Sequence, residues 1–220
     1  MQTLKLSKEG NIHVVTMING AKANTFTADI LDEHMAICDE IEKSTDNGAV
    51  ILTSDDPKFW TNGINLEWLM AQGGDYIPKF KDHIDKMLLR WARLRFPTIA
   101  CLNGHAFGGG AILACCFDFR LMRSDRGFFC FPEVDVNIPF TDIMHEIIDC
   151  LPNKQSLWDL AFTGRRIGGE EAQKMNVVQD SYVGDEIMPK ALELANLLAQ
   201  KDRATYSEIK RGLKRNLYRL

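Results

Sequence analysis

Three short segments of the chain carry residues whose types and spacing could do chemistry. The first is the run Gly108, Gly109 and Gly110 at the start of an apolar helical stretch. Glycines there let a ligand approach the backbone, and the unpaired amides of a helix N-terminus attract negative charge. Tight packing of a helix on a sheet explains such a run equally well. The spacing fits neither a dinucleotide-binding loop nor a P-loop.

The other two segments each follow a predicted strand. Residues 61–66 (TNGINL) turn into a helix, and an Asx-type turn is their simpler interpretation. Glu133 comes after Pro132 and places a carboxyl group among Phe128, Phe129 and Phe131. Apolar neighbours raise the pKa of a carboxyl group by desolvation, which suits a general base. An exposed surface glutamate is the alternative interpretation.

Alternating strand and helix patterns must position these segments. Apolar runs predict strands over residues 12–18, 49–53, 98–102, 119–122 and 128–131, with a brief strand at Val177 and Val178. Helical periodicity begins near Thr27, whose hydroxyl could cap the helix, and dominates again from about residue 140. Short strands that alternate with helices predict an α/β fold. We expect one core domain over residues 1–200, with a basic C-terminal helix over residues 201–220 as part of the same unit.

Composition excludes several classes of protein. The 220 residues carry a net charge of −4, with 45% hydrophobic and 25% charged residues, which is ordinary for a soluble globular chain. A mildly acidic chain is a poor nucleic-acid binder, and no apolar run reaches the length of a membrane span. The first ten residues lack the apolar centre of a signal peptide.

Metal and disulfide chemistry have little support in the sequence. The six cysteines form no C-x-x-C pair and lie mostly in apolar runs, so we expect buried free thiols and a reducing compartment. The five histidines have no metal-ligand spacing.

Taken in order, the motifs resemble the crotonase (enoyl-CoA hydratase/isomerase) family. Residues 59–66 (FWTNGINL) are similar to its first oxyanion-loop signature, and residues 103–110 (NGHAFGGG) to its second. Residues 131–133 (FPE) with 137–139 (NIP) are similar to its catalytic-glutamate segment, and residues 163–167 (TGRRI) to a later family stretch. Four ordered motifs over residues 12–200 make the resemblance specific.

The resemblance implies a ββα spiral around a thioester site, with a short helical C-terminal extension. It assigns Glu133 as the catalytic base and the backbone amides of Ile64 and Gly109 as the oxyanion hole. No cofactor or metal is implied, because coenzyme A is part of the substrate. The substrate-binding residues expected are Lys22, Ala23, Asn62, Gly63, Trp68, Phe107, Gly108 and Pro132.

The residue type at position 112 distinguishes between the reactions that the family resemblance allows. Hydratases of this family hold water between two glutamates; the position of the first is Ile112 in this chain, and that of the second is Glu133. One carboxylate can instead move a proton from C2 to C4 of a 3-enoyl thioester. This pattern resembles the compact Δ3,Δ2-enoyl-CoA isomerases. Hydration, thioester hydrolysis, decarboxylation and non-catalytic acyl-CoA binding remain alternatives.

Two charged features of the sequence each have two interpretations. Residues 201–220 hold seven Lys or Arg against two acidic residues, a local charge of +5 that leaves about −9 for the rest of the chain. They form either a solvated helix face or a contact with a coenzyme A phosphate. Asp142 is either a second acid in the site or, as we favour, a favourable charge at a helix start.

The expected partners and location follow from the same features. We expect an acyl-CoA substrate and a homotrimer or hexamer, with no nucleic-acid or membrane partner. The last residues, 218–220 (YRL), are only loosely similar to a peroxisomal S-K-L signal. We therefore expect a cytoplasmic location, with a peroxisomal one as the alternative.

Overall fold

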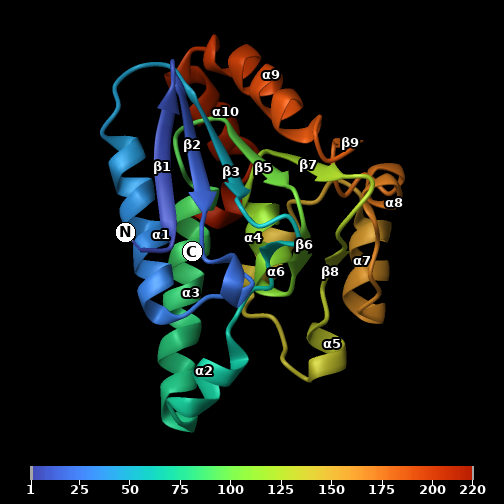
Figure 1. Cartoon of the computed structure of the whole chain (residues 1–220). Helices are drawn as coiled ribbons and strands as arrows, with labels where there is room; N and C mark the ends of the chain where they lie inside the picture. Colours follow the sequence, from blue (N-terminus) through green and yellow to red (C-terminus); the bar gives the residue numbers. More distant parts are fainter. Residues whose placement is uncertain (1, 220) are drawn as a thin grey trace.

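The computed structural model describes residues 2–219 as two β-sheets enclosed by helices (Figure 1). The larger sheet has the strand order β1-β2-β3-β5-β7-β9; β1 is antiparallel to β2, and the other neighbours are parallel. The predicted α/β fold is therefore confirmed. The strands are Leu4–Glu9 (β1), Ile12–Met17 (β2), Ala49–Ser54 (β3), Thr98–Leu102 (β5), Phe119–Arg123 (β7) and Asp180–Tyr182 (β9).

A second, smaller sheet is made of three short parallel strands in the order β4-β6-β8. They are Phe59–Thr61 (β4), His105–Phe107 (β6) and Phe129–Cys130 (β8). Along the chain, a strand of the large sheet is followed by a strand of the small sheet and then by a helix, three times over: β3-β4-α2, β5-β6-α4 and β7-β8-α5. This repeat is the ββα spiral that the family resemblance implies.

Ten α-helices and three short 3₁₀ segments lie within residues 2–219. The 3₁₀ segments are Gly20–Lys22, Gly74–Tyr76 and Arg215–Tyr218. The α-helices are Ala28–Glu42 (α1), Leu66–Ala71 (α2), Ile77–Ala92 (α3), Gly109–Cys116 (α4), Glu133–Val136 (α5), Asp142–Ile148 (α6), Lys154–Thr163 (α7), Gly169–Lys174 (α8), Ile187–Ala199 (α9) and Arg203–Leu213 (α10).

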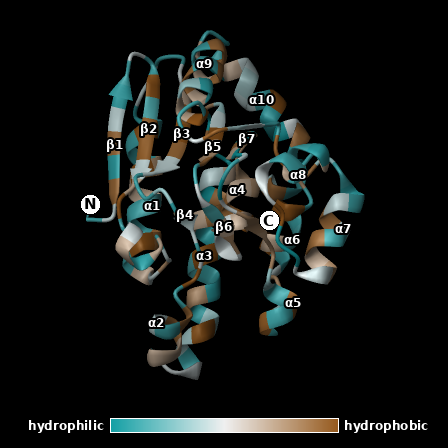
Figure 2. Ribbon diagram, turned by 45° about the vertical axis from the view of Figure 1, so that its right-hand side comes forward, coloured by the Kyte–Doolittle hydropathy of each residue, from teal (hydrophilic) through white to brown (hydrophobic). Residues whose placement is uncertain are grey.

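The large sheet is covered on both faces, so its central strands are mostly apolar (Figure 2). Side chains alternate between the faces of a strand. In β3, Val50 and Leu52 join the core formed with α1, α3 and α4, whereas Ala49 and Ile51 join a second core under α9. All six residues of β3 are buried, which explains why the strand begins with four consecutive apolar residues.

Several local predictions need correction. Thr27 precedes α1, but its hydroxyl accepts no capping hydrogen bond. Val177 and Val178 are buried but not in a strand; the last strand, β9, starts at Asp180. Only two residues of the predicted strand over 128–131 pair, because the chain then turns into α5.

Two further predictions concern membranes and the chain ends. None of the helices within residues 2–219 is long and apolar enough to span a membrane. Residues 1 and 220 lie outside the described part of the chain, so the tail compared with a targeting signal is described only through residue 219.

Candidate active site

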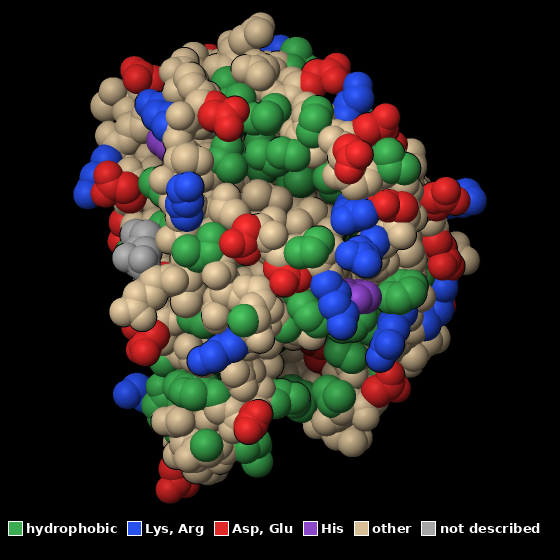
Figure 3. Space-filling view, in the orientation of Figure 1, with side chains coloured by type: hydrophobic (Ala, Val, Ile, Leu, Met, Phe, Trp, Pro, Cys, Tyr) green, Lys and Arg blue, Asp and Glu red, His purple; other side chains and the backbone are tan. Residues whose placement is uncertain are grey.

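The three strands of the small sheet bring the chemically promising segments together. Residues 62–64 follow β4, Gly108 and Gly109 follow β6, and residues 131–133 follow β8. Because the strands are parallel, their carboxyl ends lie at the same edge of the sheet, the usual place for a ligand in parallel α/β architectures. On the face drawn in Figure 3, the surface is hollowed between the ends of α2 and α5, with hydrophobic side chains on both sides.

The turns after β4 and β6 are in direct contact. A Cβ atom on Gly63 would lie 2.6 Å from the amide nitrogen of Gly109, and one on Gly109 would lie 3.6 Å from that of Ile64. Gly63 and Gly108 have φ angles of +72° and +52°, a region that side chains disfavour. Only glycine therefore allows this close approach.

Two backbone amides are left without acceptors at this contact. Phe26 bonds the backbone on both sides of Ile64, through its N–H to the carbonyl of Gly63 (2.7 Å) and its carbonyl to the N–H of Asn65 (3.0 Å). Gly109 is the first residue of α4, where an N–H has no partner within the helix. Within residues 2–219, neither the Ile64 nor the Gly109 amide donates a hydrogen bond. Together they could bind one negatively charged oxygen.

Thr61 supports this arrangement, although the sequence pattern does not single it out. Its hydroxyl donates to the carbonyl of Asn24 (2.7 Å) and accepts from the amide of Gly63 (3.0 Å). A Cβ atom on Gly110 would lie 2.3 Å from the Thr61 carbonyl oxygen, so α4 starts directly against this strand. A threonine two residues before a turn glycine was the available signal, because such hydroxyls stabilise turns.

The loop that carries Lys22 and Ala23, two of the expected substrate-binding residues, is fixed beside the first turn. The side-chain amide of Asn24 donates to Ser54 Oγ and to the carbonyls of Phe59 and Trp60, at 2.8–3.1 Å. The carbonyl of Ala23 accepts from the amide of Asn62 (3.1 Å). A cavity of about 720 Å³ opens here, lined by Lys22, Thr25, Asn62, Ile64, Asn65, Leu66, Glu67, Trp68 and Ala71.

Glu133 faces this pair of turns from the third strand. Its Oε1 lies 3.4 Å from the Cβ position of Gly108, and Pro132 packs against the same glycine at 3.9 Å. Its Oε2 is buried without a partner within residues 2–219. Burial raises the pKa of Glu133 to about 7, and no neighbouring charge contributes to the shift. A group that is half-ionised near neutral pH can both take and return a proton.

The apolar surroundings of Glu133 differ in one respect from the prediction. Phe129 and Phe131 are fully buried, but Phe128 is 42% exposed and stacks on His105 at 5.6 Å.

Ile112 is a buried member of the core, one turn inside α4. The two-carboxylate arrangement is therefore not formed at residue 112.

Asp142 begins α6, as predicted. Thr141 caps this helix by accepting from the amide of Met144 (3.1 Å), and Asp142 adds an acidic group in the first turn. Its side chain is exposed and does not line the cavity that contains Glu133.

The aromatic residues expected around the substrate lie in different places. Trp68 lines the cavity beside Lys22 and packs against Phe80 at 5.6 Å. The ring of Phe107 packs against His105 at 5.1 Å, with the guanidinium of Arg166 over it at 5.2 Å. Lys58, Arg126 and Arg166 surround His105, so the ring of Phe107 lies in a basic cluster.

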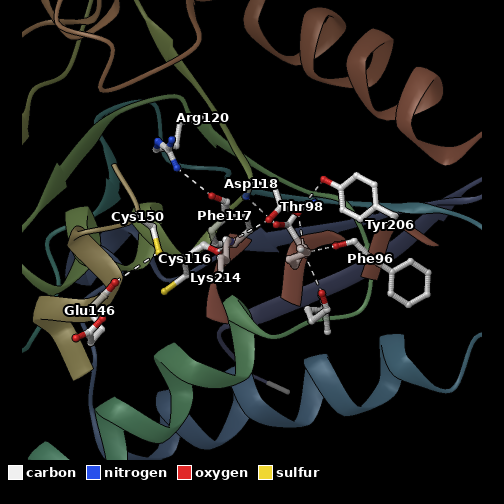
Figure 4. Close-up of polar contacts among 12 residues, drawn as sticks. Phe96, Thr98, Cys116, Phe117, Asp118, Arg120, Glu146, Cys150, Tyr206 and Lys214 are labelled. Atoms are coloured by element: carbon white, nitrogen blue, oxygen red, sulfur yellow. Dashed lines mark hydrogen bonds and ion pairs between the residues drawn. The ribbon is translucent and has the colours of Figure 1, made fainter. Parts of the chain in front are cut away.

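Two lysines of the basic C-terminal segment neither lie on a solvated helix face nor are available to contact a coenzyme A phosphate. Lys210 is buried and its Nζ lies 2.7 Å from Asp118 Oδ2. Lys214 Nζ lies 2.9 Å from Asp118 Oδ1, as Figure 4 shows. Lys210 also donates to the carbonyls of Leu94 and Phe96. These two lysines attach α10 to the core and are not free to bind a phosphate.

Residues 7–219 match the model of the enoyl-CoA hydratase/isomerase family. The chain belongs to this family. It is 27% identical to "Enoyl-CoA delta isomerase 3" of Arabidopsis thaliana over 98% of this chain and 93% of that protein. It is 29% identical to "Short-chain-enoyl-CoA hydratase" of Clostridium acetobutylicum over 96% of this chain and 81% of that protein.

Solved structures of the hydratase/isomerase family share the fold. An enoyl-CoA hydratase from Geobacillus kaustophilus superposes with a TM-score of 0.87, at 28% identity, over 98% of this chain and 81% of its own. The crotonase-like spiral expected from the motifs is thereby confirmed. Isomerases and hydratases both occur among relatives of similar identity, so the family name leaves the reaction open.

Proposed function

We propose that this family member is a Δ3,Δ2-enoyl-CoA isomerase. The observation that carries the proposal is one buried carboxyl group, Glu133, with a pKa raised to about 7, beside two free amides and without a second carboxylate at Ile112. Relatives named as enoyl-CoA delta isomerases in Arabidopsis thaliana support the same choice.

In the proposed reaction, the thioester oxygen of a 3-enoyl-CoA accepts hydrogen bonds from the Ile64 and Gly109 amides. The Glu133 carboxylate takes a proton from C2, and the electrons of that C–H bond pass into a dienolate whose negative oxygen the amides stabilise. Two such donors lower the barrier by several kcal/mol, since one is typically worth about 3 kcal/mol. Protonated Glu133 then returns the proton to C4, and a C2–C3 double bond replaces the C3–C4 bond.

Coenzyme A would extend from this point toward Lys22 and Ala23. The cavity there is polar: besides the carboxylate of Glu67 it has the cation of Lys22, which suits a phosphate, and the side-chain amides of Asn62 and Asn65, which suit an amide-rich chain. Trp68 offers an aromatic wall. The acyl-CoA is the substrate, and the proposed chemistry requires no other organic group.

Isotope exchange tests the proposal. The wild-type protein and Glu133→Gln are given 3-enoyl-CoA and 2-enoyl-CoA in heavy water, and products and deuterium at C2 and C4 are followed. We expect double-bond migration with exchange in the wild type only. Hydrated product from the 2-enoyl substrate would favour a hydratase instead. Acyl-CoA binding with no exchange at all would favour a binding protein.

A further inference from the structure

Two cavities of different chemistry adjoin the proposed reacting groups. One contains Ile64 together with Lys22 and Asn62, as described above. The other, of about 480 Å³, contains Glu133 and extends between α5, α6 and α7. A thioester has two arms, so each cavity is placed to receive one of them.

The cavity on the Glu133 side is built for an apolar chain. Nine of its thirteen lining residues are apolar; the inner wall includes Leu157 and Ile148, both buried, and the ring of Phe140. Of its acidic rim groups, Asp149 is paired with Lys154 (2.6 Å), whereas Glu146 has no cationic partner within residues 2–219 and would repel a phosphate. The coenzyme A arm therefore fits the cavity beside Lys22, and the acyl arm fits this one.

Two aromatic side chains of α7 are exposed at its mouth. Trp158 is 62% and Phe162 is 74% exposed. They are four residues apart, so they lie one turn from each other on the same side of the helix. Large apolar side chains exposed beside a groove mark a binding surface more often than isolated ones do. An acyl chain of four carbons would end near the reacting atoms, whereas a longer chain would cover both rings.

We propose that the cavity between α5 and α7 holds the acyl chain beyond the reacting carbons, and that Trp158 and Phe162 give the site a preference for medium-chain and longer acyl groups. This inference rests on the proposed function insofar as it places the thioester between Glu133 and the two free amides. It adds the substrate class and the residues that select it.

Binding of saturated acyl-CoAs tests this directly, because they need no turnover. Each methylene that leaves water is worth about a fourfold gain in affinity at full burial, and about twofold in a groove open on one side. We expect octanoyl-CoA and dodecanoyl-CoA to bind wild-type protein at least tenfold more tightly than butanoyl-CoA. In the double variant Trp158→Ala/Phe162→Ala, this advantage should fall to about threefold or less, with butanoyl-CoA affinity unchanged.

A second variant reaches the same cavity by filling it. Ala161 lines the cavity one position before Phe162, so Ala161→Phe should block long chains and spare butanoyl-CoA. Leu213→Ala is the matched control, because Leu213 is 83% exposed on α10 and outside the cavity. Melting temperatures measured on every variant identify any loss of folded protein.

The outcomes separate this inference from the proposed isomerase. Unchanged chain-length dependence in both the double variant and Ala161→Phe would overturn the acyl assignment, even if short 3-enoyl-CoA is isomerised. A change in mass by light scattering on Trp158→Ala, without any change in binding, would make the groove an interface between copies and also overturn it. The inference is supported if the variants lose the chain-length preference and the wild-type protein isomerises 3-enoyl-CoA. The same loss with no isomerisation by the wild type supports the groove and rejects the isomerase.

Discussion

The ammonium group of Lys214 lies 2.7 Å from the carbonyl oxygen of Cys116, the last residue of α4. The first residue of the same helix is Gly109, whose free amide faces the proposed substrate oxygen. The basic C-terminal segment therefore closes one end of the helix whose other end carries the amide proposed to bind the substrate oxygen. A cation at a helix C-terminus satisfies an unpaired carbonyl and interacts favourably with the helix dipole.

Replacing Lys214 by methionine should destabilise the protein without altering the reacting groups. The variant loses a capped carbonyl and one of the two cations on Asp118, so we expect the free energy of unfolding to fall by about 1–3 kcal/mol. Denaturant unfolding measures this. Arg215→Met is the control, since Arg215 is exposed and should change stability by less than about 0.5 kcal/mol. Equal effects for both variants would refute the anchoring role.

Asp118 should contribute strongly to the stability of the fold. Two lysines lower the pKa of Asp118 to about 2, against the opposing effect of burial. Because this folded-state pKa lies below the unfolded value of 3.8, the ion pair stabilises the protein above about pH 4, and the stabilisation is lost as pH falls toward 2. Asp118→Asn leaves Lys210 buried without a counter-charge and should cost about 3 kcal/mol at pH 7.

The pH dependence separates an ionic role of Asp118 from a packing role. We expect the stability difference between the wild type and Asp118→Asn to shrink steadily between pH 4 and pH 2. A difference that stays constant over this range would show that the carboxylate charge is not the stabilising feature.

Activity should depend on the ionisation of Glu133. The base must be deprotonated to take the C2 proton, and its pKa is about 7. We expect kcat/KM for a 3-enoyl-CoA to rise about tenfold per pH unit below pH 6 and to level off above pH 8. A profile without a break near neutrality would indicate a different base.

Stability should show the opposite effect of the same carboxyl group. The folded-state pKa of about 7 exceeds the unfolded value of 4.5, so burial of Glu133 costs nothing at pH 4 and becomes costly as pH rises toward 7. Glu133→Gln removes this cost and should stabilise the protein by about 3 kcal/mol at pH 8, with little effect at pH 4. Thermal melts at both pH values test this, and a variant that is less stable at pH 8 contradicts it.

The contact between the two glycine turns should not tolerate a methyl group. A Cβ on Gly63 would lie 2.6 Å from the Gly109 nitrogen and 2.7 Å from the Phe107 carbonyl oxygen, both backbone atoms that cannot move aside easily. Gly63→Ala should therefore separate the two amides and lower kcat by about 100-fold or more, the effect of losing an oxyanion donor. Gly212→Ala is the control, because nothing lies within 4 Å of its Cβ position. An active Gly63→Ala variant would exclude the paired amides from the reaction.

Much of the α/β fold and of the candidate site could be predicted because the sequence patterns that indicate them lie within short segments. Val50 and Leu52 lie in a continuous apolar run, and Gly108 and Gly109 lie at a glycine-rich helix start. Both patterns can be recognised from the sequence alone. Strands β4 and β6 were missed because they are three residues long and carry mixed side chains. Their pairing depends on neighbours far along the chain.

The partners of buried charges could not be predicted at all. Lys210 and Asp118 are far apart in sequence, and although Asp118 lies between Phe117 and Phe119, nothing near Lys210 marks it as the partner of this carboxylate. The exposure of Trp158 and Phe162 was equally hidden, since aromatic residues on a helix that also carries Leu157 and Leu160 are usually core residues.

The small sheet has one further consequence. Each proposed reactive group, the Ile64 amide, the Gly109 amide and Glu133, follows a different strand of that sheet. An acid–base group can therefore be exchanged at one strand end while the other two ends keep their places. Such independence lets a single scaffold acquire a new reaction through a change at one position, without rebuilding the rest of the catalytic centre.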